Sequence, residues 1–225
     1  MELGLLTLGD HRADPVTGVR TTQEERHRQL LEYLDFAAPA GFDAVIVGEH
    51  HFSDFSPESA MAAAELVLGV TVTLLAFPRH HLPRIADAYY EAWAEAGHAH
   101  KPRLTLNAHV HVAPTSQEAY DHLGIYQLPF QRWVFAKRIG GRPEDVELPP
   151  RITELDSPDS AITCGSPEEV LDRIGRLRKV CAFDRFTYQG DYGGQPWDRV
   201  MRSLDLFAGE VMPALVDMVA PTLKG

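Results

Sequence analysis

The sequence is poor in the residues that build disulfide frameworks and structural zinc sites. Its 225 residues include two cysteines, Cys164 and Cys181, and neither belongs to a Cys-X-X-Cys pair or to a Cys/His spacing suited to zinc. We therefore expect free thiols and a reducing compartment. The sequence has no signal-peptide pattern and no apolar run near the ~20 residues of a membrane helix. These absences predict a cytoplasmic protein without a membrane partner.

Basic residues are also scarce, since 21 Lys and Arg face 32 Asp and Glu, giving a net charge of −11. They form no cluster along the chain, so we do not expect a nucleic-acid partner. An acidic excess of this kind serves mainly solubility. A Gly-X-Gly-X-X-Gly fingerprint is missing as well, which leaves nicotinamide dinucleotide binding on a Rossmann unit without support.

What the sequence does contain is an alternation of strand and helix signals. The length favours a single domain over residues 1–225. Caps such as Thr21 or Thr22, Ser56, Ser116 and Ser166 predict helix starts. Strands are predicted at 3–8, 44–47, 70–77, 104–113, 162–164 and 185–189. This β-α alternation indicates parallel strands with crossover helices, as in an open α/β sheet or a (β/α) barrel.

One stretch, residues 124–160, departs from this alternation. It contains Pro129, Pro143, Pro149, Pro150 and Pro158, and its apolar periodicity is weak. We therefore predict a long irregular loop with helical pieces, of the kind that often carries function.

The segment Gly48-Glu49-His50-His51-Phe52 resembles the second-strand motif of the bacterial-luciferase-like flavin monooxygenases. Three further matches follow in the same order: Ser56-Pro57-Glu58-Ser59 resembles the family's phosphate-receiving helix start, and residues 89–112 and 165–213 resemble its late barrel. The resemblance implies a TIM-type (β/α) barrel that holds flavin mononucleotide (FMN).

Here only residues 52–55 separate two motifs that lie far apart in full-length members of the family. The centre of the barrel is missing, together with the basic residue that usually helps to hold the phosphate. The non-fluorescent flavoprotein of luminous bacteria shows a similar contraction. We therefore predict an incomplete barrel of about six parallel strands.

Ligand sites in parallel barrels lie at the carboxyl ends of strands, where Glu49, His50 and His51 are predicted. The resemblance implies that His50 takes part in flavin and oxygen chemistry, with Glu49 and His51 binding the cofactor. Adjacent strand residues point to opposite faces, so we predict no metal at the two histidines. The alternative is that the three residues simply satisfy the strand-to-loop junction.

A phosphate site is predicted at Ser56 and Ser59, because a helix start offers free N–H groups and the hydroxyls add donors. Arg79, which follows the third predicted strand, is a possible replacement for the missing base. The alternatives are an ordinary helix cap and a solvated loop charge. His109 and His111 share one face of their strand, where they could line the barrel interior near the flavin or pack under a helix. We predict packed core residues, and a metal would need a third ligand there.

Three hypotheses for function follow. The first is a monooxygenase that takes reduced FMN as cosubstrate from a separate reductase and uses O2 to oxidise a small organic substrate. The second is a non-catalytic flavin-binding or flavin-scavenging protein, and the third is a structural subunit without flavin. All three predict a homodimer, because missing barrel segments leave apolar faces to be covered.

Overall fold

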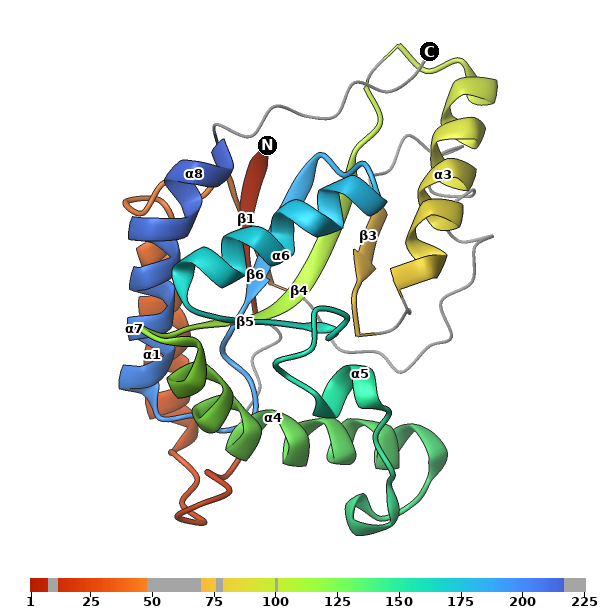
Figure 1. The fold of residues 1–225 in the computed structure, drawn as a ribbon. Coiled ribbons are helices and arrows are strands. Elements are labelled where there is room, and N and C mark those ends of the chain that lie inside the picture. The colour runs from red at the N-terminus through yellow and green to blue at the C-terminus, as the bar shows by residue number, and fades with distance from the viewer. Residues whose placement is uncertain (8–11, 48–69, 76–78, 100, 217–225) are drawn as a thin grey trace.

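The computed structural model describes residues 1–7, 12–47, 70–75, 79–99 and 101–216, and its strands form one parallel sheet (Figure 1). The order is β2-β1-β6-β4-β3, and β5 pairs with the second half of β4, opposite β6. All six predicted strands are present, and β3 ends four residues earlier than predicted. The strands are β1 (Glu2–Thr7), β2 (Ala44–Val47), β3 (Val70–Thr73), β4 (Leu104–Val112), β5 (Ile162–Gly165) and β6 (Arg185–Gln189).

Helices cover the sheet and its carboxyl end (Figure 1). The predicted helix at residues 56–68 lies outside the described residues. The longer helices are α1 (Gln23–Ala37), α3 (Leu82–Ala96), α4 (Ser116–Ile139), α6 (Pro167–Val180) and α7 (Trp197–Leu206). Short turns are η1 (Arg79–His81), η2 (Pro143–Asp145), α5 (Pro150–Thr153), the π-type turn η3 (Phe207–Val211) and α8 (Met212–Val216).

The two faces of the sheet differ in chemistry because successive strand residues point to opposite sides. On β4, the even-numbered residues from Leu104 to Val112 join the main apolar core with α3, α6 and α7. The odd-numbered residues Thr105, Asn107, His109 and His111 are polar yet buried on the other face. That face, which corresponds to the interior of a barrel, is therefore built for hydrogen bonding.

The prediction of an irregular loop from residue 124 is wrong for its first part, because α4 continues through Pro129 to Ile139. Its buried face includes Gln127 and Gln131 beside Leu123 and Phe130, so polar residues interrupt the apolar spacing that marks a helix. Gly140 ends the helix in the left-handed conformation. Beyond it, residues 140–160 hold only the short turns η2 and α5, as predicted.

The sheet is open along the described part of the chain, with β2 and β3 at the two ends of the strand order. This agrees with the predicted incomplete barrel of six parallel strands. In Figure 1, α4 lies across the carboxyl ends of the strands, where it contacts β4 and β5. The described helices include none long and apolar enough to cross a membrane.

Candidate functional site

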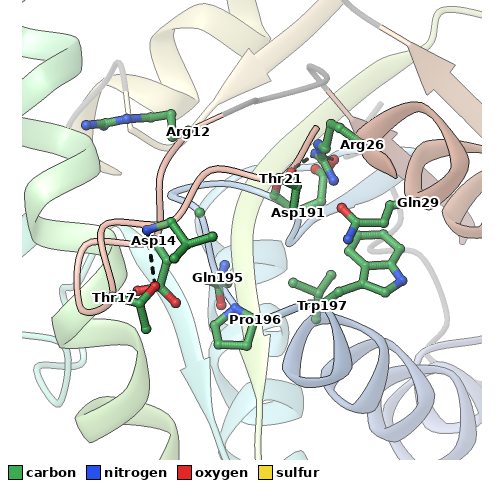
Figure 2. A pocket seen from close by; sticks show the side chains of 13 residues that line it. Arg12, Asp14, Thr17, Thr21, Arg26, Gln29, Asp191, Gln195, Pro196 and Trp197 are labelled. Atoms are coloured by element: carbon green, nitrogen blue, oxygen red, sulfur yellow. Dashed lines mark hydrogen bonds and ion pairs between the residues drawn. The ribbon is translucent and has the colours of Figure 1, made fainter. Parts of the chain in front are cut away.

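A cavity of about 190 Å³ opens at the carboxyl ends of β1 and β6 (Figure 2). Its walls come from residues 12–21 after β1, from α1, and from residues 191–197 after β6. We call it the β1/β6 cavity. Loops at this end of parallel strands are where α/β proteins bind ligands.

A buried ion pair forms the back of this cavity. The Arg26 Nη2 atom donates to the Asp191 carboxylate at 2.9 Å and to its backbone carbonyl at 3.2 Å, and Thr7 at the end of β1 donates to the same carboxylate. Burial raises the pKa of Asp191 even though Arg26 and Thr7 favour its charged form. The carboxylate is therefore held at a net electrostatic disadvantage, a property common at functional sites.

Two glycines allow the loop after β6 to reach both neighbouring segments. Gly193 and Gly194 have φ values of 78° and 71°. A Cβ on Gly194 would lie 2.6 Å from the carbonyl oxygen of Ala13, and one on Gly193 would lie 2.9 Å from that of Tyr126. Only glycine fits such approaches at positive φ, so this pair fixes the cavity loop against residue 13 and α4.

Gln195 ties this loop to a stacked pair of histidines, of which His111 is buried and His122 is partly exposed. The Gln195 Nε2 group donates to the carbonyls of Gly190 and Tyr192, both at 2.9 Å. Its Oε1 atom lies 3.1 Å from His122 Nε2, so that ring nitrogen must carry the proton. The His122 ring stacks on His111 with centroids 4.7 Å apart, and burial lowers the pKa of His111 to about 3.

A network of neutral side chains crosses the polar face of the sheet. Asn107 Nδ2 donates to Gln189 Oε1 at 2.9 Å, and Thr187 Oγ1 donates to Asn107 Oδ1 at the same distance. Gly4 lies opposite, where a Cβ would come within 2.6 Å of the Thr187 methyl group. Asn107, Thr187 and Gln189 are therefore buried and linked to one another by hydrogen bonds.

Next to this network lies a second group formed by His109, Gln127 and Tyr192, with Gln131 one helical turn after Gln127 on the buried face of α4. We call these four residues the His109 cluster. Gln127 Oε1 lies 3.3 Å from His109 Nδ1, and the rings of His109 and Tyr192 stack with centroids 4.0 Å apart. Gln127 Nε2, Gln131 Nε2 and Tyr192 Oη are buried, and the described residues offer them no hydrogen-bond partner. Such groups are rare in folded proteins and usually serve a bound molecule or water.

Comparison with known proteins identifies the chain's relatives. A sequence profile of the luciferase-like monooxygenases matches residues 55–182, more than half of the chain. The chain belongs to the luciferase-like monooxygenase family. No curated protein matches it in sequence.

Solved luciferase-like structures share the fold. Monooxygenase RslO1 of Streptomyces bottropensis is 20% identical with a TM-score of 0.55, and the match covers 95% of this chain and 68% of that one. The FMN-bound oxygenating constituent of 3,6-diketocamphane monooxygenase from Pseudomonas putida is 24% identical, with a TM-score of 0.51 over 81% of this chain and 50% of that one. Flavoprotein 390 is 11% identical with a TM-score of 0.54, and the match covers 97% of this chain and 98% of that one.

Most predicted site residues of this luciferase-like chain, namely Glu49, His50, His51, Ser56 and Ser59, lie outside the described residues, so their roles stay predictions. Arg79 is described and half-buried. Its Nη2 atom donates to the Ser160 carbonyl at 3.2 Å, and its Nη1 atom lies 3.9 Å from Asp159, so the residue bridges to the segment before β5. Its role in phosphate binding also stays a prediction.

His109 and His111 are buried, as predicted, but they lie on the polar face of the sheet and not among the residues of the main apolar core. In the part of the chain that the structure describes, no group of three or more His, Cys, Asp or Glu side chains is arranged for a metal ion.

The predicted site residues do not include Arg26, Gln127, Gln131 or Asp191. A signal existed for Asp191, because it lies two residues after the last predicted strand and just before Gly193 and Gly194, and ligand loops in parallel barrels begin at the carboxyl ends of strands. The two glutamines gave no such signal, since polar residues in an unrecognised helix resemble a loop.

Proposed function

We propose that this protein binds FMN and acts as a flavin-dependent oxidoreductase that uses reduced FMN and O2 to oxidise a small organic molecule. Family membership supports flavin chemistry in general. The observation that carries the proposal is the His109 cluster, with its three partnerless neutral groups at the carboxyl end of a parallel sheet.

The cluster suits a flavin ring in chemistry. The isoalloxazine ring is uncharged when oxidised and carries carbonyl oxygens, which accept from amide N–H and phenol O–H groups such as those of Gln127, Gln131 and Tyr192. No charged side chain belongs to the cluster, so a neutral ring meets no uncompensated charge there. When bound, reduced FMN would supply the electrons that activate O2.

The surrounding residues would orient the ring and keep water away. Phe130 lies beside both aromatic members of the cluster, with ring centroids 5.9 Å from His109 and 5.4 Å from Tyr192. Leu123 and Ile162 pack into the same apolar group. Exclusion of water by such walls protects reactive flavin chemistry.

The experiment is a titration of the protein with oxidised and reduced FMN, followed by O2 uptake with reduced FMN and candidate substrates. In the Q127L/Q131L double variant, FMN affinity should fall about 10-fold or more, because two hydrogen bonds of about 1 kcal/mol each are lost. The control Q117L removes an exposed glutamine that bonds only Asp121, and it should bind FMN as the wild type does. Equal FMN affinity in the double variant and the wild type would refute the assignment of the ring to this cluster.

A non-catalytic flavin carrier is the second candidate. The match to flavoprotein 390 favours this candidate. Because the match spans nearly the whole of both chains, neither chain needs a complete barrel to fold. Tight FMN binding without O2-dependent turnover would select this candidate, and the absence of flavin binding would exclude both. The predicted homodimer and separate reductase stay proposals, to be tested by sedimentation and by pull-down with a flavin reductase.

A further inference from the structure

Gln29 on α1 has a polar side chain that no contact in the fold explains. It lines the β1/β6 cavity and is 9% exposed. The hydrogen bonds of the described residues leave its amide without a partner, although Arg26, one turn earlier on the same helix, is fully engaged. Figure 2 shows Gln29 beside Trp197, on the cavity side of α1. A largely buried side chain whose amide reaches a cavity can both donate to and accept from a molecule bound there.

We propose that the β1/β6 cavity is a binding site for a small neutral organic molecule with a carbonyl or hydroxyl group, and that Gln29 recognises this group. That this molecule is the substrate of the flavin reaction rests on the proposed function; its binding does not.

The charges of the cavity wall favour a neutral ligand because they are engaged with the protein. Arg26 is paired with Asp191. Asp14 Oδ1 accepts from the backbone N–H groups of Val16 at 2.7 Å and Thr17 at 3.1 Å. The Arg12 guanidinium lies 4.7 Å from the centre of the Trp133 ring. A charged ligand would have to disrupt these contacts or lose its hydration without a counter-charge.

The remaining wall offers a surface for a carbon skeleton. Val19, Pro196, Trp197 and Val200 line the cavity. The Trp197 ring is held in place, since its Nε1 donates to Glu32 at 2.7 Å and the Arg26 guanidinium lies 5.7 Å from its centre. The volume of about 190 Å³ is below the roughly 300 Å³ at which drug-sized sites begin, so the ligand is small.

The β6–α7 loop joins this cavity to the His109 cluster. Asp191 lines the cavity, while its neighbour Tyr192 stacks on His109. The same loop would therefore contact both a molecule in the cavity and the proposed flavin ring.

The test uses one carbon skeleton with different head groups, and the full-length protein without flavin. Cyclohexanone, cyclohexanol, cyclohexanecarboxylate and cyclohexylammonium are titrated while the Gln29 side-chain amide and the Trp197 indole are followed by NMR. The ketone and the alcohol should shift both signals, and the two ions should bind at least 10-fold more weakly. In Q29L, affinity for the neutral pair should fall about 3- to 10-fold, as for one lost hydrogen bond. The control Q117L should bind all four compounds as the wild type does.

Q29E supplies a signature that a purely structural role would not produce. A carboxylate accepts but does not donate, so Q29E should keep affinity for cyclohexanol and lose it for cyclohexanone. The proposal is overturned if no neutral compound binds, if the ions bind better, or if Q29L binds the ketone as tightly as the wild type. This assay contains no flavin, so its outcome is independent of the proposed FMN site. If FMN does not bind, the cavity proposal can still be correct, and if FMN binds but the titration fails, the cavity proposal is wrong.

Discussion

The molecule contains two arginine–carboxylate pairs with different roles. One lies where α4 meets α6 and holds the fold together, and the other faces the β1/β6 cavity. We call their surroundings the α4–α6 corner and the cavity corner. In the pair between Arg173 and Glu169 of α6, the arginine is the more deeply buried side chain, 3% exposed against 25%. In the pair between Arg26 and Asp191 it is the carboxylate, 2% exposed against 10%. The two pairs share a chemistry but have opposite effects on the carboxylate.

At the first pair, the protein satisfies every group that it buries. Arg173 donates to Glu169 at 2.7 Å and to the carbonyls of Leu155 at 2.7 Å and Ile162 at 3.1 Å. Tyr120 of α4 donates to the same carboxylate at 2.6 Å. Burial alone would raise the pKa of Glu169, but hydrogen bonds from Ser116, Tyr120 and Arg173 lower it overall. This α4–α6 corner therefore stabilises the ionised pair.

At the cavity, burial dominates instead. The pKa of Asp191 is raised although Arg26 and Thr7 both favour its charged form. A buried pair of this kind adds little stability, because desolvation offsets its attraction. The comparison indicates that Arg173 is kept for the fold and that Asp191 is kept for the cavity.

The largest expected effect is that of R173A. Removing this guanidinium leaves the buried Leu155 and Ile162 carbonyls and the Glu169 carboxylate without their donor, so the free energy of unfolding should fall by about 3–5 kcal/mol. Urea denaturation measures this. The matched control is R176A on the same helix, because Arg176 and Asp172 form an exposed pair, 51% and 55% exposed, which should contribute under about 1 kcal/mol. If R173A and R176A lower the free energy of unfolding by similar amounts, the buried pair does not stabilise the fold more than an exposed one, and the contrast between the two corners is wrong.

The second largest expected effect is a fall in the free energy of unfolding at low pH, caused by His111 in the cavity corner. Its pKa of about 3 lies below the 6.5 of a free histidine, so the unfolded chain binds this proton first as the pH falls. The stability that His111 contributes is complete above pH 6.5 and is lost between about pH 6.5 and pH 3. At pH 5 the loss is about 2 kcal/mol relative to pH 8.

H111F separates this effect from the other titrating groups. The phenyl ring can still stack on His122 but binds no proton, so the stability of the variant should depend less on pH between 5 and 8, by about 2 kcal/mol. Asp191 and His122 are present in both proteins and largely cancel in the difference. Urea melts at pH 5 and 8 give the four values needed. An unchanged pH dependence would show that His111 is not buried in its neutral form.

The sequence contained enough to predict the sheet but not the site. Strands such as Leu104–Val112 alternate apolar residues with Thr, Asn or His, and this alternating signal is local. The helix α4 was missed beyond residue 123 because Gln127 and Gln131 replace apolar residues on its buried face, and that face becomes visible only when the opposite strand is in place. Pro129 added to the error, since a proline usually ends a helix.

The candidate site depends on contacts between residues far apart in sequence. Arg26 and Asp191 are 165 positions apart, and no spacing rule connects an arginine on the first helix with an aspartate after the last strand. The motif around Glu49–His51 could be recognised because it is contiguous. Local patterns therefore identified the family, whereas the cavity required the fold.

The smallest expected effect on stability, and the most informative one, is that of D191N. The amide removes the desolvation cost that raises the pKa of Asp191 while keeping the volume of the side chain and an acceptor for Arg26. The Asn oxygen still accepts from Arg26 but leaves its buried charge without a counter-charge, so the free energy of unfolding should fall by about 1–2 kcal/mol, less than in R173A, which removes every hydrogen bond of the arginine. In the cavity, by contrast, Arg26 loses its counter-charge, so binding of cyclohexanecarboxylate should strengthen relative to cyclohexanone. Urea denaturation and the NMR titration on one preparation measure both. If D191N unfolds the protein as severely as R173A does, Asp191 is part of the framework of the fold, and the contrast between the two corners is wrong.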